Sequence, residues 1–292
     1  MVAAEFTYSQ KNPECAVAYA QFEAMHTRME IVLPRIDECE AQQIVRNVEQ
    51  RVKALERLMN RFDERSPLAV VNALAASEAV VVDDELFMAL ELCEVFRRGT
   101  GGYFDVAASE QARQGAAYWL DGKNHTVKLA SADVRIDLGG FAKGFALEQV
   151  NRMLRERKVD SAVVNFGNSS IVALGHHPFG EWWPIGVANR LRSGSMAEEF
   201  RLRDSALSVS GRAESGDYHI INPHTGLRVA GQELVAVEGR SPLVAEVLST
   251  ALYAAPHTHR AEIVAKYEGY RAMELYCHRD GTTEKRIIDK TK

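Results

Sequence analysis

Residues 137–144, Asp-Leu-Gly-Gly-Phe-Ala-Lys-Gly, combine an acid, two glycines and a lysine at a spacing that could bind an anion. Polar and apolar residues alternate over 133–137, which predicts a strand, and apolar residues recur at helical spacing over 141–154. A glycine turn between a strand and a helix can aim backbone N–H groups and the positive end of the helix dipole at a phosphate. Lys143 could add a positive charge, and Asp137 could hold a hydroxyl or amide of the ligand. The run is neither a P-loop nor G-x-G-x-x-G, so a turn that needs glycines only for its geometry explains it equally well.

Hydrophobic periodicity predicts the elements that would position this turn. Apolar residues at a 3.6-residue spacing predict amphipathic helices over about 37–61 and 84–98. Alternation predicts a strand over 25–33 and a hairpin over 118–129 about Asp121-Gly122. Further strands are expected at 161–165, 171–174, 185–188, 200–202, 207–210 and 273–277, and further helices from Pro242 and near Ala261. Residues before Ala24 give no clear element, and the charged C-terminal tail is expected to be frayed. This order favours one α+β domain over residues 1–292, with two closely packed lobes that share a cleft.

Composition excludes several classes of protein. The 292 residues are 46% hydrophobic and 26% charged, which is typical of a globular protein. A net charge of −5 argues against a general nucleic-acid binder, which would need a basic face. The four cysteines form no Cys-x-x-Cys pair, so a zinc site or disulfide framework is not expected. No apolar run approaches the ~20 residues of a membrane span, and no signal peptide is visible. As written, the chain is expected to be cytoplasmic, or periplasmic or membrane-anchored if a leader was removed.

The run at 137–144 resembles the D-L-G-G-x-A-K-G signature of the ApbE family, the FAD:protein FMN transferases. Other stretches resemble the same family in the same order, and together they extend from about Met25 to Ala255. The resemblance implies a mixed sheet-and-helix fold with a flavin cleft between the lobes. It also implies that FAD contacts Met25, Phe62, Tyr103, Phe104, Asp105, Asp137, Lys143, His219 and Ile221.

Three of these stretches lie in the N-terminal half. Met25-His26-Thr27 resembles the family's M-G-T, with histidine in place of glycine. Phe62 stands where the family often places an aromatic residue against FAD, and the sequence Gly-Gly-Tyr-Phe-Asp at 101–105 resembles G-G-x-F-D. From the residues alone, Met25 and Phe62 could equally be core residues, and Asp105 a surface acid after a glycine helix stop.

The C-terminal stretches carry a histidine and two substitutions. Residues 208–211 and 219–226 resemble S-x-S-G followed by H-I-I-D-P-x-T-G, in which His219 would stabilise phosphate charge or move a proton. Asn222 replaces the family aspartate. Asn168 replaces the second glycine of N-x-G-G, and asparagine tolerates the left-handed conformation that such a turn requires.

A metal site is expected on the helix that starts near Pro242. Residues 245–251 resemble A-D-A-x-S-T-A, with Glu246 in place of the aspartate. Glu246 and Thr250 are four residues apart and share a helix face. With a carbonyl oxygen from the Gly140 turn they would form an oxygen-only site suited to Mg²⁺, to which Ser249 could contribute. The alternative is a glutamate favoured by the dipole of the first helical turn.

The resemblance implies an Mg²⁺-dependent transferase that moves FMN from FAD to a Thr or Ser hydroxyl of an acceptor protein and releases AMP. The partners would be FAD and that protein, not nucleic acid. Two alternatives stay open: a flavin-binding or structural relative without catalysis, and an enzyme that hydrolyses FAD to FMN and AMP. The altered positions His26, Asn168, Asn222 and Glu246 favour the non-catalytic relative.

Overall fold

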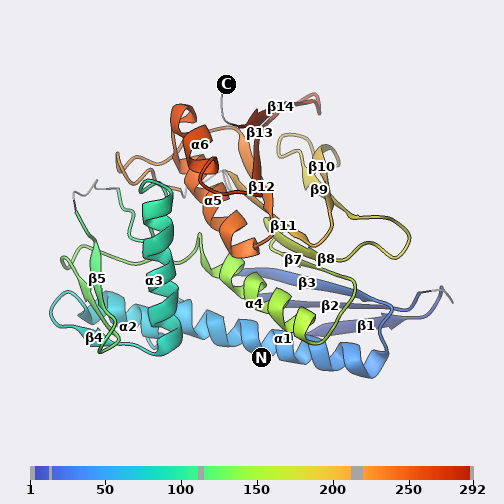
Figure 1. Ribbon diagram of the computed structural model, residues 1–292, viewed down its shortest axis with the longest axis horizontal. Coiled ribbons are helices and arrows are strands. Elements are labelled where there is room, and N and C mark those ends of the chain that lie inside the picture. Colours follow the sequence, from blue (N-terminus) through green and yellow to red (C-terminus); the bar gives the residue numbers. More distant parts are fainter. Residues whose placement is uncertain (1–3, 13–14, 111–114, 212–219, 290–292) are drawn as a thin grey trace.

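A nine-stranded antiparallel sheet organises the chain in a computed structural model that describes residues 4–12, 15–110, 115–211 and 220–289 (Figure 1). Its strands, in spatial order, are β1 (Glu5–Ser9), β2 (Val17–Ala24), β3 (Thr27–Pro34), β7 (Ala162–Phe166), β8 (Ser170–Leu174), β11 (Ser205–Gly211), β12 (Leu234–Gly239), β13 (Arg271–Cys277) and β14 (Thr283–Ile288). The expected α+β class is confirmed.

Three long helices, α1 (Glu38–Met59), α4 (Ala142–Glu156) and α5 (Pro242–Ala254), cover one face of this sheet (Figure 1). Each helix buries an apolar stripe against the sheet. The strands alternate to match: Met29, Ile31 and Leu33 of β3 are fully buried on the helical face, whereas Glu30 on the other face is half-buried. The main core therefore lies between this sheet and its helices.

The opposite face of the sheet is covered in part by a two-stranded sheet of β9 (Trp183–Ala188) and β10 (Met196–Leu202). Trp183 and Phe200 pack there on Leu207 and Val209 of β11. Because side chains alternate along a strand, Ser208 and Ser210 of β11 point to the other face, towards α5. This alternation brings serine hydroxyls to α5.

A smaller layer flanks the main sheet on the left of Figure 1. It contains α2 (Pro67–Leu74), α3 (Asp84–Gly99) and a three-stranded sheet in the order β4 (Val80–Val81), β6 (Thr126–Leu129) and β5 (Tyr118–Asp121). Ser66 and Asp83 cap the two helices, each accepting a hydrogen bond from a backbone N–H of the first turn. The apolar side chains of this layer belong to the same core as α1 and α4.

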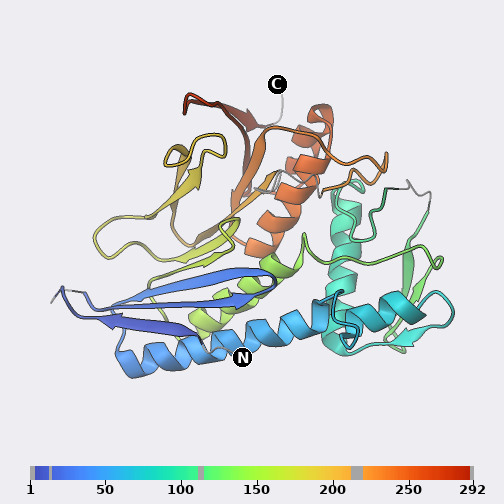
Figure 2. The same ribbon diagram turned by 180° about the vertical axis from the view of Figure 1, so that it is seen from behind.

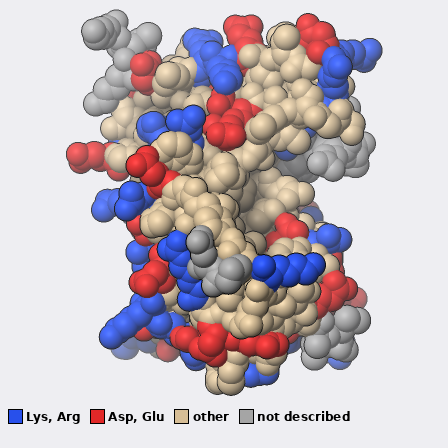
Figure 3. Space-filling view, turned by 90° about the vertical axis from the view of Figure 1, so that its right-hand side faces the viewer, with Lys and Arg blue, Asp and Glu red and all other residues tan. Residues whose placement is uncertain are grey.

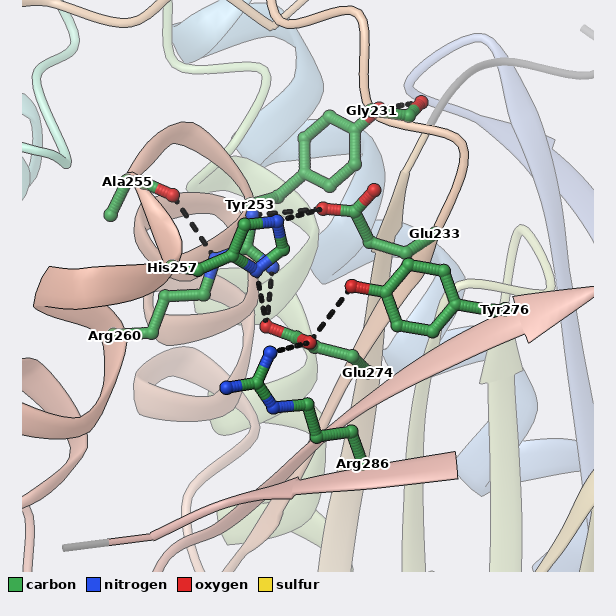
Figure 4. A network of polar contacts seen from close by, with 9 residues as sticks. All are labelled: Gly231, Glu233, Tyr253, Ala255, His257, Arg260, Glu274, Tyr276 and Arg286. Atoms are coloured by element: carbon green, nitrogen blue, oxygen red, sulfur yellow. Dashed lines mark hydrogen bonds and ion pairs between the residues drawn. The ribbon is translucent and has the colours of Figure 1, made fainter. Parts of the chain in front are cut away.

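A buried ionic cluster fixes α6 (His257–Val264) to the end of the sheet (Figure 4). Arg260 donates to Glu274 Oε1 of β13 at 2.8 Å and to Glu233 Oε1, just before β12, at 2.9 Å. Tyr276 donates to Glu274 Oε2 at 3.0 Å, and His257 Nδ1 lies 2.9 Å from Glu274 Oε1. Burial alone would raise the pKa of Glu274, but the hydrogen bonds from His257, Tyr276 and Arg260 outweigh it and hold that pKa below its ordinary value.

The structure corrects several predictions from the sequence. Residues 133–137 do not form a strand, because the side chain of Asn72 takes both backbone hydrogen bonds of Ile136. Met25 and His26 belong to the turn before β3 rather than to the strand. Elements β1, β2, α2, β4, β12 and β14 had not been predicted. None of the helices in the described part of the chain is both long and apolar enough to cross a membrane.

Candidate functional site

A cavity of about 440 Å³ lies where the small layer meets α4, α5 and the main sheet. The turn before α4 forms one wall, and the ends of β11 and of the segment around 220–223 form the other. Of the residues predicted as ligand contacts, Tyr103, Phe104, Asp105, Asp137, Lys143 and Ile221 line it, as do the predicted metal ligands Gly140, Glu246 and Thr250. His219 lies outside the described residues.

The N-terminus of α4 opens into this cavity. Within the described chain no side chain caps the helix, and Gly139 and Gly140 line the cavity just before its first turn. Asp137 Oδ1 accepts a hydrogen bond from Gly139 N at 2.9 Å, which closes the turn. A Cβ on Gly140 would lie 3.3 Å from Thr250 Oγ1, so glycine is what allows the turn to approach α5 so closely. Together with the ammonium of Lys143, this end of the helix can bind an anionic group.

Asn72 of α2 holds the strand-like segment that leads to the turn. Its Nδ2 donates to Ile136 O at 2.9 Å and its Oδ1 accepts from Ile136 N at 2.7 Å, while Asp137 N donates to Val106 O at 2.7 Å. These bonds fix the backbone on both sides of Ile136 and therefore place Asp137. Reasoning from the sequence missed Asn72. The available signal was a lone amide within the apolar segment Pro67–Leu74.

Glu246 has a buried carboxylate, and the side chains that bond to it among the described residues come from three different elements. Its Oε1 lies 2.5 Å from Lys143 Nζ of α4, and its Oε2 accepts hydrogen bonds from Ser170 Oγ of β8 and, at 2.9 Å, from Ser208 Oγ of β11. Only 4% of the residue is exposed. Helices α4 and α5 cross closely here, since a Cβ on Gly144 would lie 2.6 Å from Glu246 Cβ. The carboxylate thus joins both helices to the sheet.

Three hydroxyl groups continue this network. Ser249 Oγ donates to Glu246 O at 3.0 Å and lies 2.9 Å from Ser208 Oγ and 2.8 Å from Ser210 Oγ. Ser249 is fully buried and is not among the residues that line the cavity, in contrast to Thr250. Its hydroxyl therefore joins α5 to β11 behind the cavity wall and does not face the cavity.

The donors present are of the types that Mg²⁺ takes: the Glu246 carboxylate, the Thr250 hydroxyl and the backbone of Gly140 all border one cavity. In the described residues, no group of three or more His, Cys, Asp or Glu side chains is arranged to hold a metal ion. Magnesium commonly needs only one or two carboxylates beside phosphate oxygens and water, so such a group is not required. The carboxylate of Glu246 is already bonded to an ammonium, however, and an ion would have to displace Lys143 from it.

A second, smaller cavity of about 130 Å³ adjoins the first and shares Arg61, Asp137, Gly139 and Lys143 with it. Arg61 stands at the junction: its Nε lies 3.0 Å from Asp137 Oδ2, and its guanidinium lies 4.3 Å from the centre of the Phe62 ring. Phe62 is 67% exposed, so it is not the core residue that the alternative reading required. Sequence reasoning had not singled out Arg61.

Met25 and His26 border this second cavity from the β2–β3 turn. Both have positive φ angles, 49° and 60°, which glycine or asparagine would adopt more readily. Met25 N donates to Glu56 Oε1 of α1 at 2.7 Å, and the His26 ring meets Phe62 edge-on with ring centres 5.6 Å apart. These contacts hold the turn against the end of α1.

The other two motif turns also have defined partners. Asn168 adopts the left-handed conformation expected of it, with φ of 55°, and its N–H donates to Asn165 Oδ1 at 3.1 Å. Asn222 Oδ1 accepts from His224 N at 2.9 Å, and His224 Nε2 lies 3.0 Å from Gly101 O. The segment after residue 220 is thereby tied to the glycine loop around Gly101 on the facing side of the cavity.

Comparisons with known proteins agree with this architecture. The sequence model of the ApbE family matches residues 25–116 and 108–273. A protein of Treponema pallidum named FAD:protein FMN transferase is 26% identical over 280 residues, covering 80% of this chain and 76% of its own length. A Chlamydia muridarum protein of the same name is 24% identical over 247 residues, covering 72% and 75%.

Solved structures show the same fold. The flavin transferase ApbE of Vibrio cholerae superposes with a TM-score of 0.76 at 18% identity, covering 97% of each chain. The ApbE protein of Thermotoga maritima superposes with a TM-score of 0.77 at 22% identity, covering 96% of each.

Proposed function

This chain belongs to the ApbE family, and we propose that it is an FAD:protein FMN transferase, which moves FMN from FAD to a Thr or Ser hydroxyl of an acceptor protein. One observation carries the proposal: the N-terminus of α4, with Gly139, Gly140 and Lys143, opens into a cavity of about 440 Å³. That end of a helix suits a pyrophosphate, the part of FAD at which the reaction takes place.

The reaction requires stabilisation of charge more than it requires covalent help from the protein. The acceptor oxygen forms a bond to the phosphorus on the FMN side, and the bond from that phosphorus to the bridging oxygen breaks. AMP leaves with the bridging oxygen, and the acceptor hydroxyl releases its proton to solvent. The backbone at Gly139 and Gly140 and the Lys143 ammonium are the groups we assign to the charge that develops on the phosphates.

Magnesium, if bound, would be held by Glu246, Thr250 and the backbone of Gly140. It would supply positive charge to the phosphate oxygens. Lys143 would then be released from Glu246 and could turn to the ligand, so both cations would stabilise the negative charge of the pyrophosphate.

The test is to incubate the purified protein with FAD and Mg²⁺, with and without a purified domain that carries a threonine flavinylation site recognised by another flavin transferase. We expect AMP release together with covalent flavin on the domain, detected by fluorescence of the denatured protein in a gel. AMP release without the domain would indicate FAD hydrolysis instead. The protein should also bind FAD more tightly than FMN, because FMN lacks the pyrophosphate.

The Lys143–Glu246 contact supports a second candidate, an FAD-binding relative without catalysis. An ammonium bonded to the carboxylate at 2.5 Å neutralises the only acid that we assign to the ion. In that case FAD would bind and remain intact in the same experiment, with or without Mg²⁺.

A further inference from the structure

A second groove lies on the face of the sheet away from α4 and α5. It has a volume of about 430 Å³, and we call it the β9 groove because five consecutive residues of β9, 184–188, form one wall. Its floor includes Tyr19, Glu30, Val32 and Val163 from strands β2, β3 and β7. Seen from behind, strands β1 to β3 (blue) have no helix in front of them (Figure 2). Figure 3 shows that the molecule is hollowed near the middle of the face on the right-hand side of Figure 1.

The wall of the β9 groove is a strand edge. Among the described residues β9 pairs with β10 alone, so its other edge has backbone N–H and C=O groups without a strand partner. Such an edge is a template for an extended polypeptide. Pro184, the second residue of the strand, has no N–H to contribute, so main-chain pairing along this edge would depend on the residues after it.

The polar side chains on the floor of the groove form hydrogen bonds with one another. Glu30 accepts hydrogen bonds from Tyr19 OH and from Asn165 Nδ2, each at 2.8 Å. The apolar side chains of Val32 and Val163 lie directly opposite each other, in the same row as Tyr19 and next to the row of Glu30 and Asn165. An occupant would therefore be recognised mainly through its main chain along β9, with small or β-branched side chains on the valines.

The β9 groove adjoins the cavity of about 440 Å³ at the N-terminus of α4, which we call the flavin cavity. Arg190 and Val209 line both, and the adjacent residues Asn168 and Ser169 line the groove and the cavity respectively. Arg190 is the second residue after the end of β9. A chain that lies along this strand thus has one end at the place where the proposed transfer occurs.

We propose that an extended segment of the acceptor polypeptide, next to its modified Thr or Ser, binds in the β9 groove by adding a strand to the edge of β9. The inference rests on the proposed function, since a transferase needs to bring a protein hydroxyl to the phosphate. Five strand residues at ~3.4 Å each span ~17 Å, enough to bind about five acceptor residues. The hydroxyl side chain then enters the cavity past Arg190.

The first experiment fills the groove without touching the flavin cavity. Thr7, Tyr19, Val32 and Val163 form one row across four neighbouring strands on the same face. Val163→Trp fills the floor beside β9, and Thr7→Trp is the matched control at the far end of that row, outside the groove. We expect Val163→Trp to raise the KM for the acceptor domain by about tenfold or more with an unchanged Kd for FAD. Thr7→Trp should change neither constant.

The second experiment looks for the added strand itself. Hydrogen exchange is measured for the intact protein with FAD, before and after addition of the acceptor domain. The amides of β9 that point away from β10, which alternate along the strand, should become protected, and those of the edge strand β1 should not. Equal exchange at β9 with and without saturating domain, or an unchanged KM in a folded Val163→Trp variant, would overturn the proposal.

The two proposals can fail separately. If the wild-type protein binds the domain and FAD but transfers no FMN, the proposed function is wrong, while protection of β9 still supports the groove. If transfer occurs without protection at β9, the function stands and the acceptor binds elsewhere.

Discussion

The ammonium of Lys143 lies 2.5 Å from Glu246 Oε1, which ties the first turn of α4 to the middle of α5 at the edge of the cavity. Both side chains are largely buried, and Ser170 and Ser208 donate to the other carboxylate oxygen. One carboxylate therefore serves the packing of two helices and is also the acid assigned to Mg²⁺. The Lys143 ammonium and Mg²⁺ therefore compete for the carboxylate oxygens of Glu246, and substitution of Glu246 measures that competition.

Glu246→Gln should lose Mg²⁺-dependent AMP release and about 2 kcal/mol of stability, because it leaves a mostly buried ammonium without its counter-charge. Glu246→Asp should keep or raise the Mg²⁺-dependent rate, since its shorter arm draws back from Lys143. The measurement is AMP release against MgCl₂ concentration, with urea unfolding in parallel. Full Mg²⁺ dependence in Glu246→Gln would remove this residue from the metal site.

Gly144→Ala should separate α4 from α5. The added Cβ would lie 2.6 Å from Glu246 Cβ, closer than packed atoms can be, and 3.0 Å from the backbone at Leu243. We expect a loss of about 1–3 kcal/mol in urea unfolding and weaker FAD binding. Gly122→Ala is the matched control, because nothing lies within 4 Å of its Cβ. Equal stability of the two variants would show that the helices can move apart freely.

Asn72→Ala should loosen the segment that positions Asp137. Both polar groups of Ile136 would lose their side-chain partner in a buried environment, at about 2 kcal/mol. FAD affinity, measured by fluorescence quenching, should fall as well. The same change at the exposed Asn124 should alter neither quantity. Unchanged FAD affinity in Asn72→Ala would mean that Asp137 is held by its other contacts.

His26→Gly should be more stable than His26→Ala by about 1 kcal/mol. Both variants lose the ring contact with Phe62, but glycine adopts a φ of 60° without the steric cost that alanine has. Thermal unfolding of the two variants gives the comparison directly. If alanine is as stable as glycine, the β2–β3 turn relaxes when the histidine is removed.

Glu274 should make stability fall in acid. Its folded pKa is below the ordinary value of 4.5, so its contribution is complete above about pH 4.5 and is lost as pH falls through the folded pKa. Glu274→Gln should be about 3 kcal/mol less stable at pH 7, where Arg260 loses a partner, and this gap should narrow towards pH 3. Urea midpoints at both pH values test it. Glu284→Gln, at an exposed position in β14, should show no gap at either pH.

Local patterns in the sequence were sufficient for the long helices and for the chemistry of the α4 turn. The apolar stripe predicted a helix over 37–61, and α1 occupies Glu38–Met59, because a 22-residue amphipathic helix contains its own signal. The glycines at 139 and 140, with Lys143, already indicated an anion site. The motif resemblance, which needs only residue types in order, identified the family.

Tertiary structure decided what local patterns do not encode. Residues 133–137 alternate like a strand, yet the backbone at Ile136 is bonded to the side chain of Asn72, 64 residues earlier. Strand β2 is defined by pairing with β3, β1 by pairing with β2, and β14 by pairing with β13, not by strong patterns of their own. The partnership of Lys143 with Glu246, 103 residues apart, depends on a close helix crossing at Gly144. The sequence by itself determined which residues could do the chemistry, whereas long-range packing decided which of them meet, because contact between distant residues is a property of the folded chain.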